Sequence, residues 1–168
     1  MTTFLISDTH FGHKGVCEFL CEDGITKVRP WSHPDDMDEA LVKNWNSAVG
    51  PKDKVYHLGD VVINKRCLQT LSRLNGDKVL IKGNHDIFQL KEYLPYFRDI
   101  RAYHVLDRFI LSHIPVHESQ KERFKGNIHG HLHESTLPDP WYHCVSVEQI
   151  NFTPIAYDII KEKLNAFR

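Results

Sequence analysis

Five short apolar runs in this chain end in the same way, with aspartate, asparagine or histidine placed directly after the run. The endings are SDTH at 7–10, LGD at 58–60, GNHD at 83–86, LSH at 111–113 and HGHLH at 129–133. An ordinary turn uses glycine, asparagine or a lone aspartate, but it does not need imidazole beside carboxylate. The repeated ending therefore constrains the fold, because it suggests elements whose ends can meet in space.

The segments between these endings predict alternating strands and helices, followed by consecutive strands. Strands are expected at 2–7, 53–60, 77–86, 125–133 and 141–150, and as a pair within 100–113 that turns near Asp107. Helices are expected at 34–50, 66–76 and 153–167, the last with Thr153 as its cap and Pro154 at its first position. The least regular parts are 12–34 and 114–124. This order predicts an α/β fold in a single domain of residues 1–168, with two mixed sheets packed together and helices outside.

Composition limits the class of partner. The 21 basic residues nearly balance the 22 acidic ones, which argues against long duplex nucleic acid as a partner. No apolar run has the length of a membrane span, and the first residues lack the pattern of a signal peptide. The four cysteines form no CxxC pair, which favours reduced thiols and a cytoplasmic location. Composition does not indicate an oligomeric state.

The side chains at the five endings are typical of a metal centre. The candidate ligands are Asp8, His10, Asp60, Asn84, His113, His131 and His133. Residues two apart on an extended chain point the same way, so Asp8 with His10, and His131 with His133, are expected to face one side. Sites in α/β sheets gather beyond the carboxyl ends of the strands. Imidazole, carboxylate and amide without thiolate suit manganese, iron, zinc or nickel, and seven ligands fit two bridged ions.

The order DxH, GD, GNHD, H and GHxH resembles the pattern of the calcineurin-like metallophosphoesterases. The stretches SDTHFGH, VYHLGD and LSHIP look most like small, single-domain members from bacteria and their phages. The resemblance covers residues 4 to about 160 and implies a four-layer α/β/β/α sandwich. It implies one divalent ion on Asp8, His10, Asp60 and His133. A second ion would lie on Asp60, Asn84, His113 and His131, with Asp60 as the bridge.

The resemblance also implies a reaction. The chain would be a metal-dependent phosphohydrolase in which a hydroxide that bridges two ions, preferably manganese, attacks phosphorus. His85 would act as general acid and phosphate stabiliser and not as a ligand. Asp86 is grouped with His85 as a catalytic residue that orients its neighbours, and Gly83 is expected to let the backbone turn.

Phosphodiester hydrolysis is the expected activity, on a small phosphoester or nucleotide. The alternatives are a phosphomonoesterase or nucleotide pyrophosphatase, and a nuclease on short or single-stranded nucleic acid. A non-catalytic scaffold, such as the retromer subunit that has this fold with an impaired site, is disfavoured because every ligand position and His85 are present. Four residues are candidate substrate contacts, each weighed against a surface or structural role: His13, Lys14, Arg29 and His129.

Overall fold

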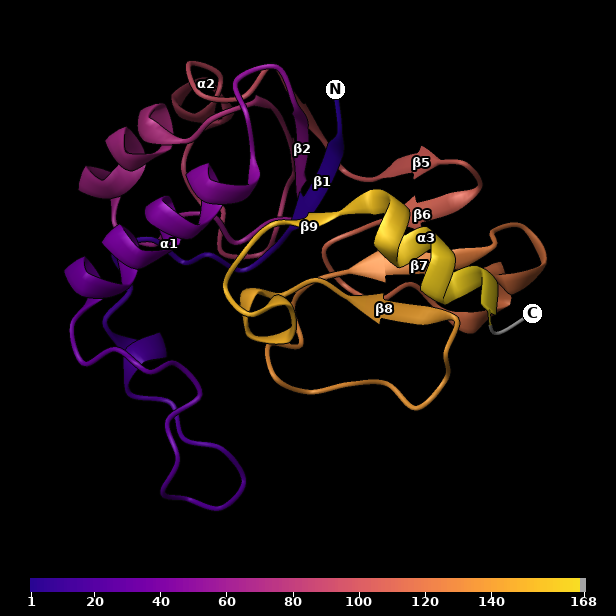
Figure 1. Cartoon of the computed structure of the whole chain (residues 1–168), viewed down its shortest axis with the longest axis horizontal. Coiled ribbons are helices and arrows are strands. Elements are labelled where there is room, and N and C mark those ends of the chain that lie inside the picture. The colour runs from indigo at the N-terminus through magenta and orange to yellow at the C-terminus, as the bar shows by residue number, and fades with distance from the viewer. Residues whose placement is uncertain (167–168) are drawn as a thin grey trace.

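Two mixed β-sheets pack together in the computed structural model, which describes residues 1–166 (Figure 1). The first sheet has the order β4-β3-β2-β1-β9 and consists of Asp99–Arg101, Asp77–Ile81, Lys54–His57, Thr3–Ile6 and Ile155–Ala156. Its strands β1 to β4 are parallel, and β9 runs antiparallel to β1. The second sheet has the order β5-β6-β7-β8 and consists of His104–Leu106, Phe109–Leu111, Gly126–His129 and Tyr142–Cys144. Here β5 is antiparallel to β6, whereas β6, β7 and β8 are parallel.

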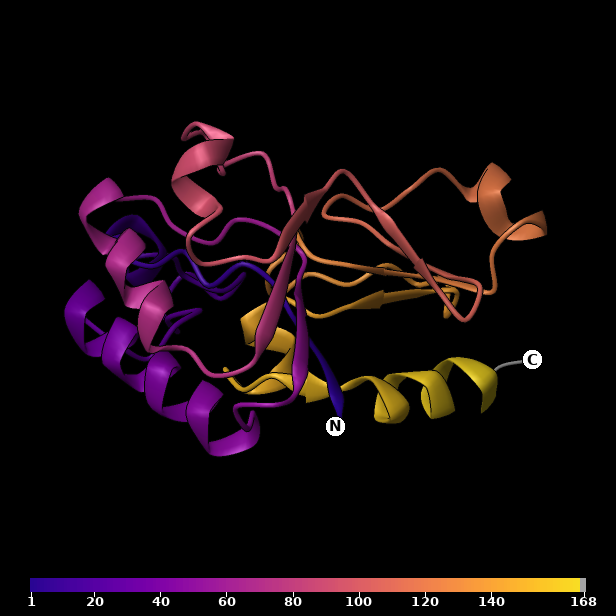
Figure 2. The same cartoon turned by 90° about the horizontal axis from the view of Figure 1, so that it is seen from above.

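Helices cover the outer face of the first sheet (Figure 2). The longest is α1 (Pro34–Ala48), which has proline at its start and acidic residues in its first turn, where they complement the helix dipole. Its residues Met37, Leu41 and Trp45 recur at helical spacing and are buried in a core that includes the outer face of the sheet. The short helix α2 (Leu90–Tyr93) and the 3₁₀ helix η2 (Lys65–Arg73) contribute to the same core.

A second core joins the two sheets and α3 (Tyr157–Ala166). Neighbouring residues of β1 divide between the two cores, with Ile6 in the first and Leu5 in the second. This division is expected for parallel strands that are buried on both faces. On α3, Tyr157, Ile160 and Leu164 pack into the second core. The fold is therefore the predicted α/β arrangement of two mixed sheets flanked by helices.

Two segments differ from the sequence prediction, 100–113 in the number of strands and 66–76 in the type of helix. The segment 100–113 contributes to three strands, because the chain leaves the first sheet after β4 and enters the second at β5. The predicted turn near Asp107 joins β5 and β6, with φ of 50° at Asp107 and 70° at Arg108, as tight hairpin turns require. The predicted helix at 66–76 is the 3₁₀ helix η2, whose buried Leu68 and Leu71 are three residues apart.

The end of the chain also differs from the prediction. The strand expected at 141–150 is only β8, and the 3₁₀ helix η4 (Val147–Ile150) follows it. The closing helix starts at Tyr157 and not at Thr153, because residues 155–156 pair with β1 as strand β9. Phe167, in the predicted helix, lies outside the described residues.

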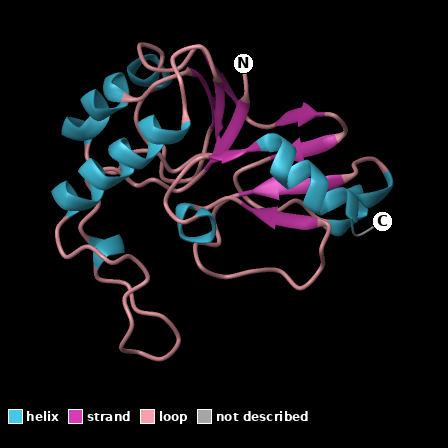
Figure 3. Ribbon diagram, viewed as in Figure 1, coloured by secondary structure: helices cyan, strands magenta, loops and turns pink. Residues whose placement is uncertain are grey.

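The least regular part of the chain lies where the sequence predicts it. Apart from the 3₁₀ helix η1 (Gly15–Cys17), residues 12–33 form loops and turns that extend away from the sheets (Figure 3). The second irregular stretch, 114–124, contains the 3₁₀ helix η3 (Glu118–Glu122). Within residues 1–166, no helix has both the length and the apolar character needed to cross a membrane.

Candidate metal centre

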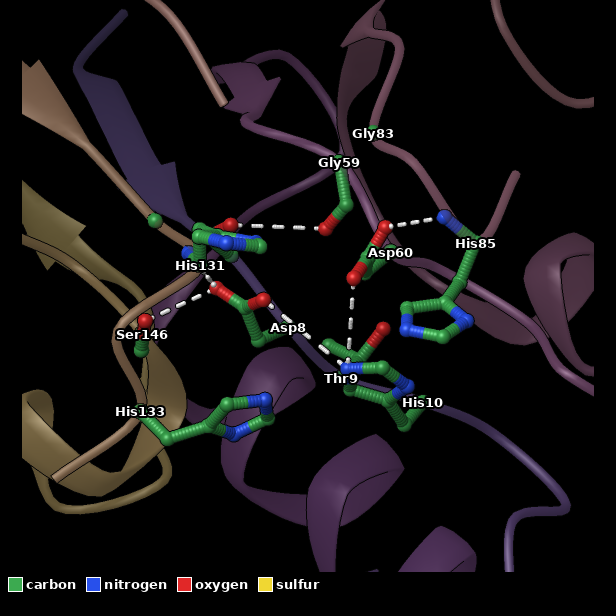
Figure 4. Close-up of polar contacts among 12 residues, drawn as sticks. Asp8, Thr9, His10, Gly59, Asp60, Gly83, His85, His131, His133 and Ser146 are labelled. Atoms are coloured by element: carbon green, nitrogen blue, oxygen red, sulfur yellow. Dashed lines mark hydrogen bonds and ion pairs between the residues drawn. The ribbon is translucent and has the colours of Figure 1, made fainter. Parts of the chain in front are cut away.

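The carboxyl ends of five strands meet at one edge of the two sheets. In the first sheet Ile6 pairs with His57 and His57 pairs with Leu80, so β1, β2 and β3 end side by side. The second sheet joins this edge through two backbone hydrogen bonds that link the end of β1 to the chain after β8, from Ser7 N to Val145 O and from Val147 N to Ser7 O. The predicted ligands follow these strand ends and therefore come together, although more than a hundred residues separate the first from the last (Figure 4).

Most of these side chains lie on left-handed backbone, not on extended strands. The φ angles are 59° at Asp8, 49° at His10, 56° at Asp60, 70° at His131 and 52° at His133. The expected alternation along an extended chain is therefore wrong as an explanation, although the paired residues do face one region. Left-handed backbone is costly for residues other than glycine, and such strain concentrates at functional sites.

The side chains form two groups of potential ligand atoms. The first group consists of Asp8, His10 and His133, and the second of Asp60, His113 and His131. Within each group the potential ligand atoms lie within 4.8 Å of one another. The two groups meet at Asp60, whose Oδ2 is 3.6 Å from His10 Nε2 and 3.4 Å from His113 Nε2. The Asn84 Oδ1 joins the second group, 2.8 Å from His113 Nε2 and 3.1 Å from His131 Nδ1.

The chemistry of these atoms fits divalent cations. The Asp8 Oδ1 and both ring nitrogens of His10 are buried without a hydrogen-bond partner. The Leu58 carbonyl, 2.7 Å from His113 Nδ1, can only accept, so Nδ1 carries the proton. The Nε2 lone pair of His113 then faces the oxygens of Asn84 and Asp60. Facing lone pairs repel each other, and a cation between them removes that repulsion.

Electrostatics within the site oppose the cost of burial. Burial alone would raise the pKa of Asp8, but the contact with His10 and the imidazoles of His113 and His133 outweigh it and hold the pKa well below its usual range. For His113, burial would lower the pKa, whereas the adjacent Asp60 carboxylate raises it above the ordinary value. Each carboxylate thus has a partner that stabilises its anionic form, which is the form that binds metal ions.

Behind His133 lies a buried ion pair that the sequence analysis missed. The Glu148 Oε1 accepts from His133 Nδ1 at 3.0 Å and from Arg29 at 2.7 and 2.8 Å. The proton on Nδ1 leaves the Nε2 lone pair of His133 available to a metal ion, and the hydrogen bond fixes the ring. Glu148 lies in η4, where no motif marks it, and Arg29 is 119 residues away.

Arg29 corrects an expectation. It was a candidate for contact with substrate phosphate, but it is fully buried and donates to the backbone oxygens of Asp8 and Thr9 as well as to Glu148. Arg29 therefore holds the loop that carries Asp8, and its guanidinium is not available to substrate. His129, another candidate, is also buried, with 1% exposure at the end of β7, and its Nδ1 donates to Gly130 O at 2.8 Å.

Asp86 supports the site from behind. Its carboxylate is buried and accepts three backbone N–H groups, from Asp60, Val61 and Gly83, at 2.8–2.9 Å. Burial raises its pKa above the ordinary value, against the lowering effect of these N–H donors. Asp86 therefore acts as a positioning residue for the Asp60 loop, which is the orienting role expected from the sequence.

Two glycines make room for the carboxylates. A Cβ on Gly83 would lie 2.2 Å from Asp60 Oδ1, and a Cβ on Gly130 would lie 2.5 Å from Asp8 Oδ2. The φ angle of Gly83 is not positive, so the backbone turn suggested by the sequence does not explain why this residue is glycine. Glycine is needed there because the backbone passes directly beside the ligand.

Of the remaining candidates, His85 and His13 lie beside His10. His85 is exposed, its backbone N donates to Asp60 Oδ1 at 2.8 Å, and its ring centroid is 5.5 Å from that of His10 (Figure 4). The His13 ring is also 5.5 Å from His10, and burial with nearby cationic groups lowers its pKa to about 4. Lys14 is exposed and lies 3.6 Å from Glu18.

Known proteins are similar to this chain in sequence or in structure. An uncharacterized protein of Methanocaldococcus jannaschii, MJ1445, is 38% identical over 94% of this chain and 88% of its own length. The gene 66 protein of Mycobacterium phage L5 is 35% identical over 50% of this chain and 39% of its own. The crystal structure of the protein of unknown function AQ665 from Aquifex aeolicus has a TM-score of 0.76 and 26% identity, and the match covers 96% of this chain and 98% of that one.

The family assignment rests on nearly the whole chain. The calcineurin-like phosphoesterase profile matches residues 1–165, which include both ligand groups and all five strand ends. The matched fold, two mixed sheets flanked by helices, is the one described above. The two ligand groups also suit a family of metal-dependent hydrolases. The chain therefore belongs to the calcineurin-like phosphoesterase family.

Proposed function

We propose that the chain is a dinuclear metal-dependent phosphodiesterase. The observation that carries the proposal is the position of Asp60, whose Oδ2 lies within 3.6 Å of a histidine from each ligand group. A carboxylate between two such groups is suited to bridge two ions. One ion would be held by Asp8, His10, Asp60 and His133, and the other by Asp60, Asn84, His113 and His131.

Two bound divalent cations would supply Lewis acidity toward the phosphoryl oxygens and would lower the pKa of a shared water. In the hydrolysis, water adds to phosphorus, the ester P–O bond breaks, and the alcohol departs with a proton. His85 is the proposed donor of that proton, a role supported by its exposed ring beside the ligand group of His10. Asp86 and Glu148 hold Asp60 and His133 in position.

Diesters are the proposed substrates, because Asn84 and His85 are exposed and leave the site open to a phosphate with two ester groups. Manganese is the proposed metal, since the ligands combine imidazole, carboxylate and amide without thiolate. Small phosphoesters or nucleotides are the proposed partners. The free state of all four cysteines supports a reducing location such as the cytoplasm.

The test is metal removal followed by a substrate panel. Protein stripped with a chelator, with metal content verified as near zero, is expected to be inactive until manganese is added. Comparing kcat/KM for bis-p-nitrophenyl phosphate and p-nitrophenyl phosphate then separates a diesterase from a monoesterase. Full activity without metal would refute the dinuclear proposal, and a clear preference for the monoester would replace the diesterase by the monoesterase.

A further inference from the structure

A pocket of about 460 Å³ opens beside the second ligand group. Two of the residues that line it, Asn84 and His113, belong to that group. Most of the remaining wall is apolar and comes from Tyr103, Ile110, Ile114 and Val116, with Lys82 as the cationic residue of the lining. The candidate metal centre thus has an adjoining apolar surface that the hydrolysis of phosphate alone would not require.

Two large side chains of this wall, Tyr103 and Ile114, are open to solvent. Tyr103 is 59% exposed and Ile114 is 52% exposed. Tyr103 lies where the chain passes from β4 to β5, and Ile114 follows His113 directly. Exposed apolar side chains gathered beside a polar centre are typical of the part of a site that receives the organic portion of a ligand.

Hydrogen bonds hold the Ile114 side of the pocket in shape. The Ser112 Oγ donates to Ile114 O at 2.8 Å, and Val116 N donates to the side-chain oxygen of Asn127 at 2.9 Å. Asn127 is fully buried in β7, and its amide nitrogen donates to Ser112 Oγ at 2.9 Å. The Tyr142 hydroxyl donates to Val116 O at 2.9 Å. The wall is therefore formed before a ligand arrives, which lowers the entropy cost of binding.

The position of His85 indicates which group the pocket would receive. His85, the proposed proton donor, does not line the pocket, and its ring packs 5.5 Å from His10 in the other ligand group. A group bound beside Asn84 and His113 is therefore not the one that His85 protonates. It is the ester group that stays on phosphorus, and a phosphomonoester has no such group.

We infer that the pocket of Tyr103, Ile114 and Val116 is a subsite for the retained ester group of a phosphodiester, and that it selects apolar or planar groups. This inference rests on the proposed phosphodiesterase function. Tyr103 offers an aromatic face for stacking, Ile114 and Val116 offer apolar contact, and Lys82 offers a positive charge to an anionic substrate.

The kinetic test uses two diesters with the same leaving group, methyl p-nitrophenyl phosphate and phenyl p-nitrophenyl phosphate. The manganese-loaded protein is expected to prefer the phenyl ester by about tenfold in kcat/KM, because the larger group fills the pocket. In Tyr103→Ala and Ile114→Ala the ratio is expected to fall to about twofold or less, mainly through KM. The matched control is Ile159→Ala, since Ile159 is 49% exposed on α3 and does not line the pocket.

A binding measurement on the metal-free protein makes the subsite testable apart from catalysis. Diphenyl phosphate is expected to shift the backbone amide NMR signals of Tyr103, Ile114 and Val116, and to shift them less in Ile114→Ala. Phenyl-to-methyl ratios that are equal in the wild-type, Tyr103→Ala and Ile114→Ala proteins would overturn the subsite, and so would amide shifts confined to other parts of the chain. If neither diester is hydrolysed with any metal, the phosphodiesterase proposal fails, whatever the NMR result.

Discussion

The Asp86 carboxylate holds the backbone of Asp60, because its Oδ2 accepts the Asp60 N–H at 2.9 Å. The same carboxylate accepts the N–H groups of Val61 and Gly83, so one buried side chain ties the end of β2 to the end of β3. The bridging position proposed for Asp60 therefore depends on a buried residue outside the proposed ligand set.

Asp86→Asn is expected to destabilise the fold and loosen the metal centre. Asparagine offers one acceptor oxygen, and its NH₂ group would face a backbone N–H, so a buried donor loses its partner. The expected loss is about 2 kcal/mol in the free energy of unfolding. Urea denaturation measures it, with Asp158→Asn on the exposed start of α3 as the control, where about 0.5 kcal/mol or less is expected. Equal effects of the two substitutions would contradict the role of Asp86.

Glu148→Gln is expected to weaken both the fold and metal binding. The substitution leaves the Arg29 guanidinium buried without its anion, which costs about 3 kcal/mol or more. It also removes the carboxylate that orients His133, which is expected to weaken metal binding about 10- to 100-fold. Chemical denaturation and metal titration measure the two effects separately.

The control for Glu148 is Glu39→Gln. Glu39 also pairs with an arginine, Arg73, but this pair is exposed, and about 1 kcal/mol or less is expected. If Glu148→Gln retained wild-type stability and metal affinity, the buried pair would be incidental to the site.

Gly83→Ala is expected to damage the metal centre through Asp60. The added Cβ would lie 2.2 Å from Asp60 Oδ1, and this oxygen also accepts the His85 N–H, so it cannot move without losing that bond. Metal affinity is expected to fall about tenfold or more, as measured by calorimetric titration with manganese. Gly50→Ala is the control, because its Cβ would meet only Asp53 at 3.3 Å. Equal affinities in the two variants would show that the Asp60 oxygen tolerates displacement.

Asp38→Asn is expected to raise stability at neutral pH but not in acid. Asp38 accepts the Gly12 N–H with both oxygens, and burial raises its pKa from 3.8 to about 6. The folded state thus binds more protons than the unfolded state between these values, and the Asp38 contribution to stability falls as pH rises through them. The raised pKa of Asp38 corresponds to a cost of at most about 3 kcal/mol in the free energy of unfolding at neutral pH. Because asparagine also loses one acceptor oxygen, the variant is expected to be about 1–2 kcal/mol more stable than the wild type at pH 7.5.

Denaturation of the wild-type and Asp38→Asn proteins at pH 4 and pH 7.5 measures this difference. The advantage of the variant is expected to shrink to about 0.5 kcal/mol or less at pH 4, where folded Asp38 is protonated. An advantage that is the same at both values would show that Asp38 is not the group that titrates.

The convergence of the candidate ligands could be predicted because its signal is local. An apolar run followed by Asp, Asn or His marks each strand end, and parallel strands bring such ends to one edge, as Asp60 and Asn84 illustrate. Glu148 could not be predicted, because its partner Arg29 lies in an irregular loop far away in the sequence. The start of the closing helix was misplaced because residues 155–156 pair with β1, a tertiary interaction that outweighs the local signals of Thr153 and Pro154.

The last prediction concerns His85, the residue proposed to give a proton to the leaving group. His85→Asn is expected to keep both metals, because only the backbone N–H of His85 contacts Asp60, and asparagine retains that N–H. The rate is expected to fall, by an amount that depends on the leaving group. General acid assistance is worth about 10²–10⁴-fold, and it matters most when the departing oxygen is a basic alkoxide. A p-nitrophenyl ester should therefore lose least and an alkyl or nucleoside ester most.

The comparison separates two roles of His85. The measured quantity is the ratio of wild-type to His85→Asn kcat/KM for each ester, with two bound metals verified in both proteins. If His85 only binds phosphate, it contributes the same interaction whichever group leaves, and the two esters should lose equally. Equal ratios would therefore remove the proton-donor role. A variant that loses a metal would show that the His85 side chain belongs to the ligand set. Asparagine keeps the backbone N–H that contacts Asp60, so the loss could come only from the missing imidazole.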